Sequence, residues 1–157
     1  MRFVPPDDQR MQQNHIHHIG IIVPNEEQVD FLFRLTGLPR GHTVYVKEYE
    51  ATCIFSRGIF CNSEKEVDTL LEFIIPEPGS KLSQFNRGLG GLHHLAIETP
   101  DIRETAEYLD HELEIDFLEK EPVVAGDLLI NFLPPSVTRG IIIEYVQKIP
   151  QETIIES

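Results

Sequence analysis

Two stretches of the chain that lie 76 positions apart (93 − 17 = 76) begin with the same order of residues: two histidines, an apolar residue, a small residue and an isoleucine. Residues 17–23 read HHIGIIV, and residues 93–99 read HHLAIET. Each is followed by a helix-start signal, with Asn25 and Asp101 as the expected N-caps, and then by an amphipathic segment. Gly37 is expected to end the first helix. The pattern therefore predicts an internal repeat.

After each predicted helix the pattern changes to short β-type runs. They fall at 43–49, 51–56 and 67–75 in the first half, and at 116–124, 127–133 and 140–147 in the second. Each half, at about 60 residues, would bury too little surface alone, so we expect the two to share one core. Leu82, Phe85 and Leu89 indicate one face of a short helix between the halves.

These elements predict one domain over residues 15–149. It consists of module one (15–76), a linker helix (77–91) and module two (92–149), and we expect loose tails at 1–14 and 150–157.

The charge of the chain excludes some classes of partner. With 13 Lys+Arg and 26 Asp+Glu among 157 residues, the net charge is −13. A surface this acidic argues against nucleic acid and against anionic membranes. No apolar run approaches the roughly 20 residues of a membrane span, and the N-terminus has no apolar signal-peptide core. Cys53 and Cys61 provide no disulfide framework, so we expect a cytoplasmic protein.

Strand alternation separates the histidines of the two repeated stretches. His18 and His94 are expected on the face opposite the bulky apolar residues, and each is followed two positions later by a small residue, Gly20 or Ala96. A small residue beside a histidine leaves space in front of its imidazole, which indicates a ligand-binding or metal-binding site and not a packed core position. By the same alternation, the preceding His17 and His93 are expected on the helix-facing side, in structural or supporting roles.

The last strand of each half adds a carboxylate among apolar residues, Glu72 in one half and Glu144 in the other. A buried carboxylate has to be paired, protonated or bound to a metal. A single strand His is more often structural, and a single strand Glu is more often on a solvated face. One His and one Glu, repeated in both halves, favour instead one divalent metal ion held by His18, Glu72, His94 and Glu144. Zn, Ni, Co, Mn and Fe all suit these ligands.

With these features together, the sequence resembles the vicinal oxygen chelate superfamily, the glyoxalase and bleomycin-resistance group, and within it the methylmalonyl-CoA epimerase family. The resemblance rests on residues 17–23, 72–76, 90–98, 130–134 and 140–147. It implies an α+β fold in which paired βαβββ modules form a cupped, barrel-like mixed sheet with helices on the outside. It also implies metal binding by His18, Glu72, His94 and Glu144, and a homodimer.

The resemblance further implies an isomerase or epimerase that removes a proton next to a metal-chelated carbonyl, with Glu72 and Glu144 as catalytic residues. The substrate would be a small molecule with two vicinal or chelating oxygens, such as an acyl-CoA. The alternatives are a glyoxalase I-type lyase or a dioxygenase at the same site, or a metal-free protein that sequesters a ligand. One feature departs from the epimerases: they carry a further glutamate on a middle strand of the first half, whereas residues 51–55 contain no carboxylate and Glu48 and Glu50 lie just upstream.

Overall fold

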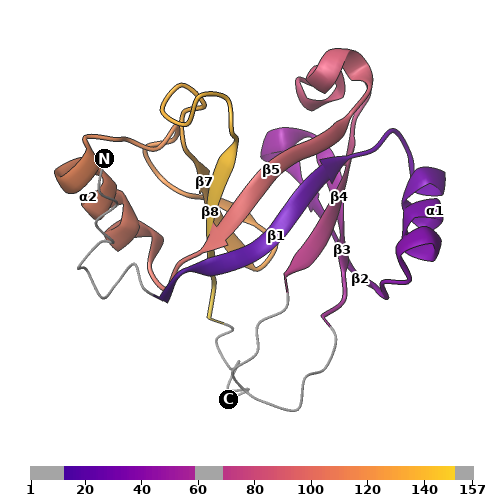
Figure 1. Ribbon diagram of the computed structural model, residues 1–157, viewed down its shortest axis with the longest axis horizontal. Helices are drawn as coiled ribbons and strands as arrows, with labels where there is room; N and C mark the ends of the chain where they lie inside the picture. Colours follow the sequence, from indigo (N-terminus) through magenta and orange to yellow (C-terminus); the bar gives the residue numbers. More distant parts are fainter. Residues whose placement is uncertain (1–12, 59–68, 151–157) are drawn as a thin grey trace, which may run out of the picture.

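The structure is a computed structural model that describes residues 13–58 and 69–150 (Figure 1). Most of the two predicted tails, Cys61, and the first two residues of the strand predicted at 67–75 lie outside the described residues.

The described elements follow the same order in each half: a strand, a helix and three strands. The first half contains β1 (His15–Ile22), α1 (Glu26–Thr36), β2 (Arg40–Val46), the short 3-10 helix η2 (Lys47–Tyr49), β3 (Ala51–Ser56) and β4 (Leu70–Pro76). After the 3-10 segment η3 (Leu82–Gly88), the second half contains β5 (Gly91–Glu98), α2 (Ile102–Leu113), β6 (Val123–Ala125), β7 (Leu128–Phe132) and β8 (Ile143–Lys148).

The two helices begin at the predicted caps. The Asn25 side chain accepts a hydrogen bond from the backbone N–H of Gln28, and Asp101 caps α2 in the same way. Gly37 ends α1 in the left-handed conformation that a glycine adopts without steric cost, as predicted.

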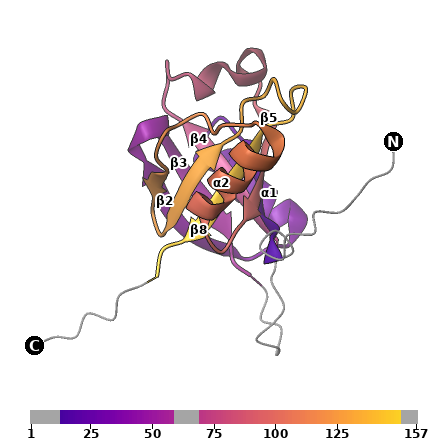
Figure 2. The same ribbon diagram turned by 90° about the vertical axis from the view of Figure 1, so that its left-hand side faces the viewer.

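All eight strands form one sheet in the order β2-β3-β4-β1-β5-β8-β7-β6. The β1/β4 and β5/β8 pairs are parallel and the other neighbours are antiparallel, so the sheet is mixed. The sheet curves so that its two edge strands, β2 and β6, lie close together. Gly126, just after β6, is so near Val44 of β2 that a Cβ atom added to it would lie 3.0 Å from the valine side chain. Figure 1 shows α1 and α2 on opposite flanks of this sheet, and Figure 2 shows α2 lying across its outer face. The α+β, barrel-like fold with outer helices is confirmed.

Strand alternation divides the apolar residues into two packed groups. Residues such as Cys53, Ile74 and Val146 point into the cupped interior. Residues such as Ile54 and Phe73 point outward and pack against α1 through Val29. The concave face is therefore lined by apolar residues on every side, and the candidate site lies within it.

Three segments differ from the predicted elements. The strand predicted at 43–49 ends at Val46, and its last three residues form η2. Of the strand predicted at 116–124, only Val123 and Val124 are strand, because the side chain of buried Asn131 hydrogen-bonds the backbone N–H and carbonyl of Glu119 in place of a neighbouring strand. The linking segment is two short 3-10 turns instead of one helix, since Phe85 is extended and the next two residues are left-handed. Leu89, which was predicted on the same helix face as Leu82 and Phe85, is 78% exposed.

No helix within residues 13–58 and 69–150 combines the length and apolar character needed to cross a membrane.

Candidate functional site

Pairing of the four central strands brings the two predicted histidines and two predicted carboxylates to one place. Gly20 on β1 lies in register with Glu72 of β4 on one side and with His94 of β5 on the other. The second module repeats this arrangement: Ala96 on β5 lies between His18 of β1 and Glu144 of β8. Each small residue thus lies between one imidazole and one carboxylate, and all four candidate side chains line the cavity inside the cup.

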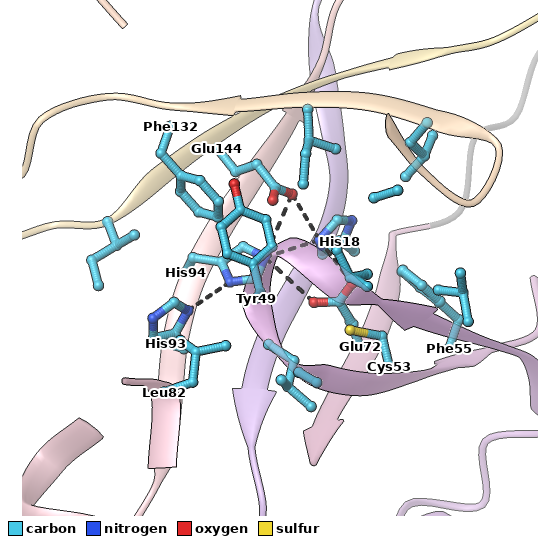
Figure 3. Close-up of a pocket in the computed structure, with 18 of the residues that line it drawn as sticks. His18, Tyr49, Cys53, Phe55, Glu72, Leu82, His93, His94, Phe132 and Glu144 are labelled. Atoms are coloured by element: carbon cyan, nitrogen blue, oxygen red, sulfur yellow. Dashed lines mark hydrogen bonds and ion pairs between the residues drawn. The ribbon is translucent and has the colours of Figure 1, made fainter. Parts of the chain in front are cut away.

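The four side chains converge within hydrogen-bonding or ion-pair distance. The Nε2 atoms of His18 and His94 are 3.0 Å apart. Glu144 Oε1 lies 3.2 Å from His18 Nε2 and 3.6 Å from His94 Nε2, and the two carboxylate oxygens of Glu72 each lie 3.6 Å from one of these nitrogens. Figure 3 shows Glu144 on one side of the imidazole pair and Glu72 on the other.

These donor atoms are placed as the ligands of one cation would be. His18, Glu72 and His94 each offer an atom, and those atoms lie within 4.8 Å of one another, so the group could hold a metal ion. Ligand atoms at about 2.0–2.2 Å from a common cation are about 2.8–3.6 Å apart when they subtend right or tetrahedral angles. The distance between the two Nε2 atoms and the four distances from these nitrogens to carboxylate oxygens, 3.0–3.6 Å, lie in that range. The predicted fourth ligand, Glu144, approaches both imidazoles but is not part of the three-residue group.

Burial shifts the protonation of all four groups toward their neutral forms. Removal from water raises the pKa of Glu72 to about 7, with the charge of Glu144 adding to the effect and His18 opposing it. Burial alone raises the pKa of Glu144 to about 8. Burial also lowers the pKa of His18, and it lowers that of His94 well below its ordinary value. Neutral imidazoles are the form that binds metal ions.

Two β-bulges, one in each module, change the positions of the preceding histidines. On β1, Ile16 and His18 face adjacent residues of β5, so His17 is an extra residue without a partner. On β5, His93 is the extra residue between Leu92 and His94. The prediction that His17 and His93 lie on the helix-facing side is therefore wrong. A bulge turns each ring toward its neighbour, and the Nδ1–Nδ1 distances are 2.7 Å for His17–His18 and 2.9 Å for His93–His94.

The site lies in a cavity of about 270 Å³ inside the cup. Its walls are mainly apolar. The ionisable side chains among the described lining residues are carboxylates, histidines, Tyr49 and Cys53. None of these described lining residues is a Lys or an Arg. The two carboxylates of the cluster and Asp127 are the acidic ones. The cavity therefore combines a polar cluster with apolar walls and no cationic side chain.

Several lining residues were not identified from the sequence. Tyr49 packs edge-to-face on Phe132, and burial with the nearby charge of Glu144 raises the pKa of its phenol to about 12. His42 stacks on Phe55 with 4.7 Å between ring centroids. Alternation along 51–56 is sufficient to place Phe55 on the concave face, whereas Tyr49 belongs to a 3-10 turn with no periodic signal.

Comparisons with known proteins agree with this architecture. The family model described as Glyoxalase/Bleomycin resistance protein/Dioxygenase superfamily matches residues 17–132. No curated protein matches the sequence. A hypothetical protein from Bacillus halodurans C-125 has a similar structure, with a TM-score of 0.74 at 23% identity over 89% of this chain and 98% of its own.

Several of the other similar structures are methylmalonyl-CoA epimerases. A variant of the Streptomyces coelicolor enzyme, solved in complex with 2-nitronate-propionyl-CoA, gives a TM-score of 0.72 at 22% identity, covering 85% of this chain and 96% of its own. A selenomethionine form of a methylmalonyl-CoA epimerase gives 0.73 at 25% identity, covering 87% and 95%.

Proposed function

This chain belongs to the glyoxalase/bleomycin resistance protein/dioxygenase superfamily, and on that premise we propose that it is a divalent-metal-dependent isomerase. It would move a proton at the carbon next to a chelated carbonyl, and methylmalonyl-CoA epimerase is the named activity with the most support. The observation that carries the proposal is the pair of buried carboxylates, Glu72 and Glu144, on opposite sides of the two imidazoles (Figure 3).

His18, Glu72, His94 and Glu144 would hold the metal ion. Without a cation, two carboxyl groups and two imidazoles would be buried together with too few hydrogen atoms to pair all of their acceptor atoms. Burial of such unpaired groups costs free energy of folding. When bound, a divalent cation supplies Lewis-acid stabilisation of the negative charge that develops on a substrate oxygen.

Glu72 and Glu144 would also move the proton. Epimerisation removes a proton from one face of a carbon and returns one to the opposite face, so it needs a base and an acid on the two sides. Because the two carboxylates come from different modules, each reaches the substrate from its own side. One would take the proton and the other would deliver one, and their roles would exchange for the opposite epimer.

Within residues 15–58 and 69–76, the described part of the first module, no carboxylate other than Glu72 lines the cavity. The β3 strand directs Ala51, Cys53 and Phe55 toward the cavity, and Glu48 and Glu50 just before it are exposed and do not line the cavity. The absence of a carboxylate from β3, noted in the sequence, therefore leaves Glu72 and Glu144 as the proposed base and acid.

The epimerase neighbours support an acyl-CoA substrate. One of them is a methylmalonyl-CoA epimerase in complex with methylmalonyl-CoA, with a TM-score of 0.73 at 22% identity. In this chain the acyl end would enter the apolar cavity. Lys81 and Arg87, both exposed in or beside η3, would contact the anionic coenzyme, because Leu82 between them lines the cavity.

A second candidate, a glyoxalase I-type lyase, is favoured by the charge of the cavity. Glu72 and Glu144 together offset the charge of a divalent cation, and no Lys or Arg of the described chain lines the cavity. A substrate whose chelating oxygens are uncharged, such as the hydroxyl and carbonyl of a hemithioacetal, places no uncompensated charge at the metal, whereas the carboxylate of a malonyl group does.

Isotope exchange distinguishes the two candidates. The metal-replete protein is incubated in deuterated water with (2R)- or (2S)-methylmalonyl-CoA, and separately with the glutathione–methylglyoxal hemithioacetal. We expect deuterium to enter the α-position of methylmalonyl-CoA, and Glu144→Gln to abolish this exchange while Glu48→Gln, a matched carboxylate outside the cavity, does not. Conversion of the hemithioacetal without exchange would instead establish the lyase.

A further inference from the structure

The contacts between neighbouring histidines restrict where their hydrogen atoms can be. Two neutral imidazoles that meet through Nδ1 share one hydrogen, so one ring donates and the other accepts. His17 and His18 meet in this way at 2.7 Å, and His93 and His94 at 2.9 Å. If His18 or His94 is the donor, its only lone pair is on Nε2, the atom that points to the centre of the cluster.

The surroundings of His17 favour that direction of donation. Its second ring nitrogen, Nε2, lies 3.9 Å from Oε1 of Glu98, which is beyond hydrogen-bond distance, and the same oxygen lies 3.5 Å from Nζ of Lys148. Glu98 is mostly buried at the end of β5, and its other oxygen lies 2.8 Å from His15 Nε2. A cation bound at Nε2 of His18 leaves the hydrogen of that ring on Nδ1, where His17 lies 2.7 Å away. The carboxylate of Glu98 favours the His17 tautomer with its hydrogen on Nε2, whose Nδ1 is then free to accept from His18.

The second module lacks this carboxylate. The ring of His93 packs edge-to-face on Phe85 at 4.8 Å between centroids, and no acidic partner of His93 is found among the described residues. The His–His contact is therefore present in both modules, whereas a carboxylate supports it only in the first.

We propose that His17 and His93 are positioning residues that accept the Nδ1 hydrogen of His18 and His94, so that both Nε2 lone pairs face the centre, and that Glu98 strengthens this arrangement in module one alone. Ligand histidines are commonly held by a carboxylate or carbonyl at the other ring nitrogen. Here a second histidine, placed by a β-bulge, has that role. The inference rests on the proposed metal site.

Zinc affinity of the purified full chain tests the proposal by calorimetry. Loss of a residue that holds a ligand typically lowers metal affinity about 10- to 100-fold, and we expect that loss for His17→Leu and for His93→Leu. His17→Asn, whose side-chain oxygen can still accept from His18 Nδ1, should recover most of it. His42→Leu, which changes a histidine of the same cavity outside the cluster, should bind zinc like the parent.

A double-mutant cycle tests the part assigned to Glu98. Glu98→Gln should weaken zinc binding in the parent and have no further effect in the His17→Leu background, because its action passes through His17. In the His93→Leu background its effect should remain in full. Additive losses with His17→Leu would overturn the role of Glu98.

NMR of the ring nitrogens shows directly which nitrogen of His18 and of His94 carries the hydrogen. A purely structural role of His17 and His93 would not determine this position. In the zinc-loaded protein, ¹⁵N spectra should show His18 and His94 carrying hydrogen on Nδ1 and bound through Nε2. Binding through Nδ1, or zinc affinity unchanged in both leucine variants, would overturn the inference and leave the metal site intact. A parent protein that binds no divalent cation would overturn the proposed metal site and this inference together. If the leucine variants do not fold, the spectra of the parent decide.

Discussion

Gly20 lies directly beneath the imidazole of His94: a Cβ atom at residue 20 would be 2.2 Å from Cε1 of that ring and 2.4 Å from Nδ1. The two residues are register partners on β1 and β5. The small residue that follows His18 in module one therefore makes room for the histidine of module two, and the site depends on contact between the modules.

Gly20→Ala should displace the His94 ring. Overpacking of this kind typically costs about 1–3 kcal/mol, and the displaced Nε2 should also lower the affinity for zinc. Thermal unfolding and calorimetry would measure the two effects. Gly79→Ala is the matched control, because nothing lies within 4 Å of its added Cβ. It should cost some stability through its positive φ and leave zinc affinity unchanged. Equal zinc affinity in all three proteins would contradict the prediction.

His18→Ala should lower the affinity for zinc more than loss of His17 or His93 does. Loss of a residue that only holds a ligand typically lowers metal affinity roughly 10- to 100-fold, and we expect a larger decrease here. The substitution removes one of four converging donors, and Nε2 of His18 lies within 3.6 Å of the other three side chains. Elemental analysis of the purified protein and zinc titration would measure the loss. His42→Ala, in the same cavity, should keep the parent's metal content, and a fully loaded His18→Ala protein would show that the metal lies elsewhere.

The stability of the metal-free protein should depend on pH through Glu144. Its folded-state pKa, raised to about 8 by burial, lies above the ordinary value of 4.5, so the folded state binds this proton more tightly than the unfolded state. The contribution to stability is therefore fully present below about pH 4.5 and is lost as the pH rises through 8. Relative to Glu144→Gln, the parent should lose on the order of 2–3 kcal/mol between pH 6 and 9.

Urea unfolding in the presence of a chelator, at a series of pH values, would measure this difference. The lowered pKa values of the histidines act in the opposite sense, but they are common to both proteins and cancel in the comparison. Parallel curves for parent and variant would contradict a raised pKa at Glu144.

Asn131→Ala should destabilise the protein by about 2–3 kcal/mol, because it leaves buried backbone groups unpaired. The Asn131 side chain is 2% exposed, and it bonds both backbone groups of Glu119 and the N–H of Phe132. The loop that it holds contributes Leu118 to the cavity wall, so hydrogen exchange should also increase around residue 118. An unchanged unfolding midpoint would show that water replaces these hydrogen bonds.

The sequence alone was sufficient for the fold class and for the superfamily. These predictions used local patterns: the repeat at residues 17 and 93, the caps at Asn25 and Asp101, and strand alternation. Each pattern reflects the backbone preference of one residue or one face of one element. The same alternation placed His18 and His94 on the face opposite the bulky apolar residues, and Glu72 and Glu144 stood out as carboxylates within apolar runs. Their assignment as metal ligands stays a prediction, but the structure brings their side chains together.

Only the tertiary structure determined how the modules meet. The bulges at His17 and His93 arise where β1 pairs with β5, and strand alternation within one segment carries no information about an extra residue opposite its partner. The fit of the His94 ring over Gly20, the irregular path of residues 116–122 around Asn131, and the approach of Glu98 to His17 depend on the same long-range pairing. Local patterns determine which face a residue prefers, whereas packing between distant strands determines which atoms come into contact.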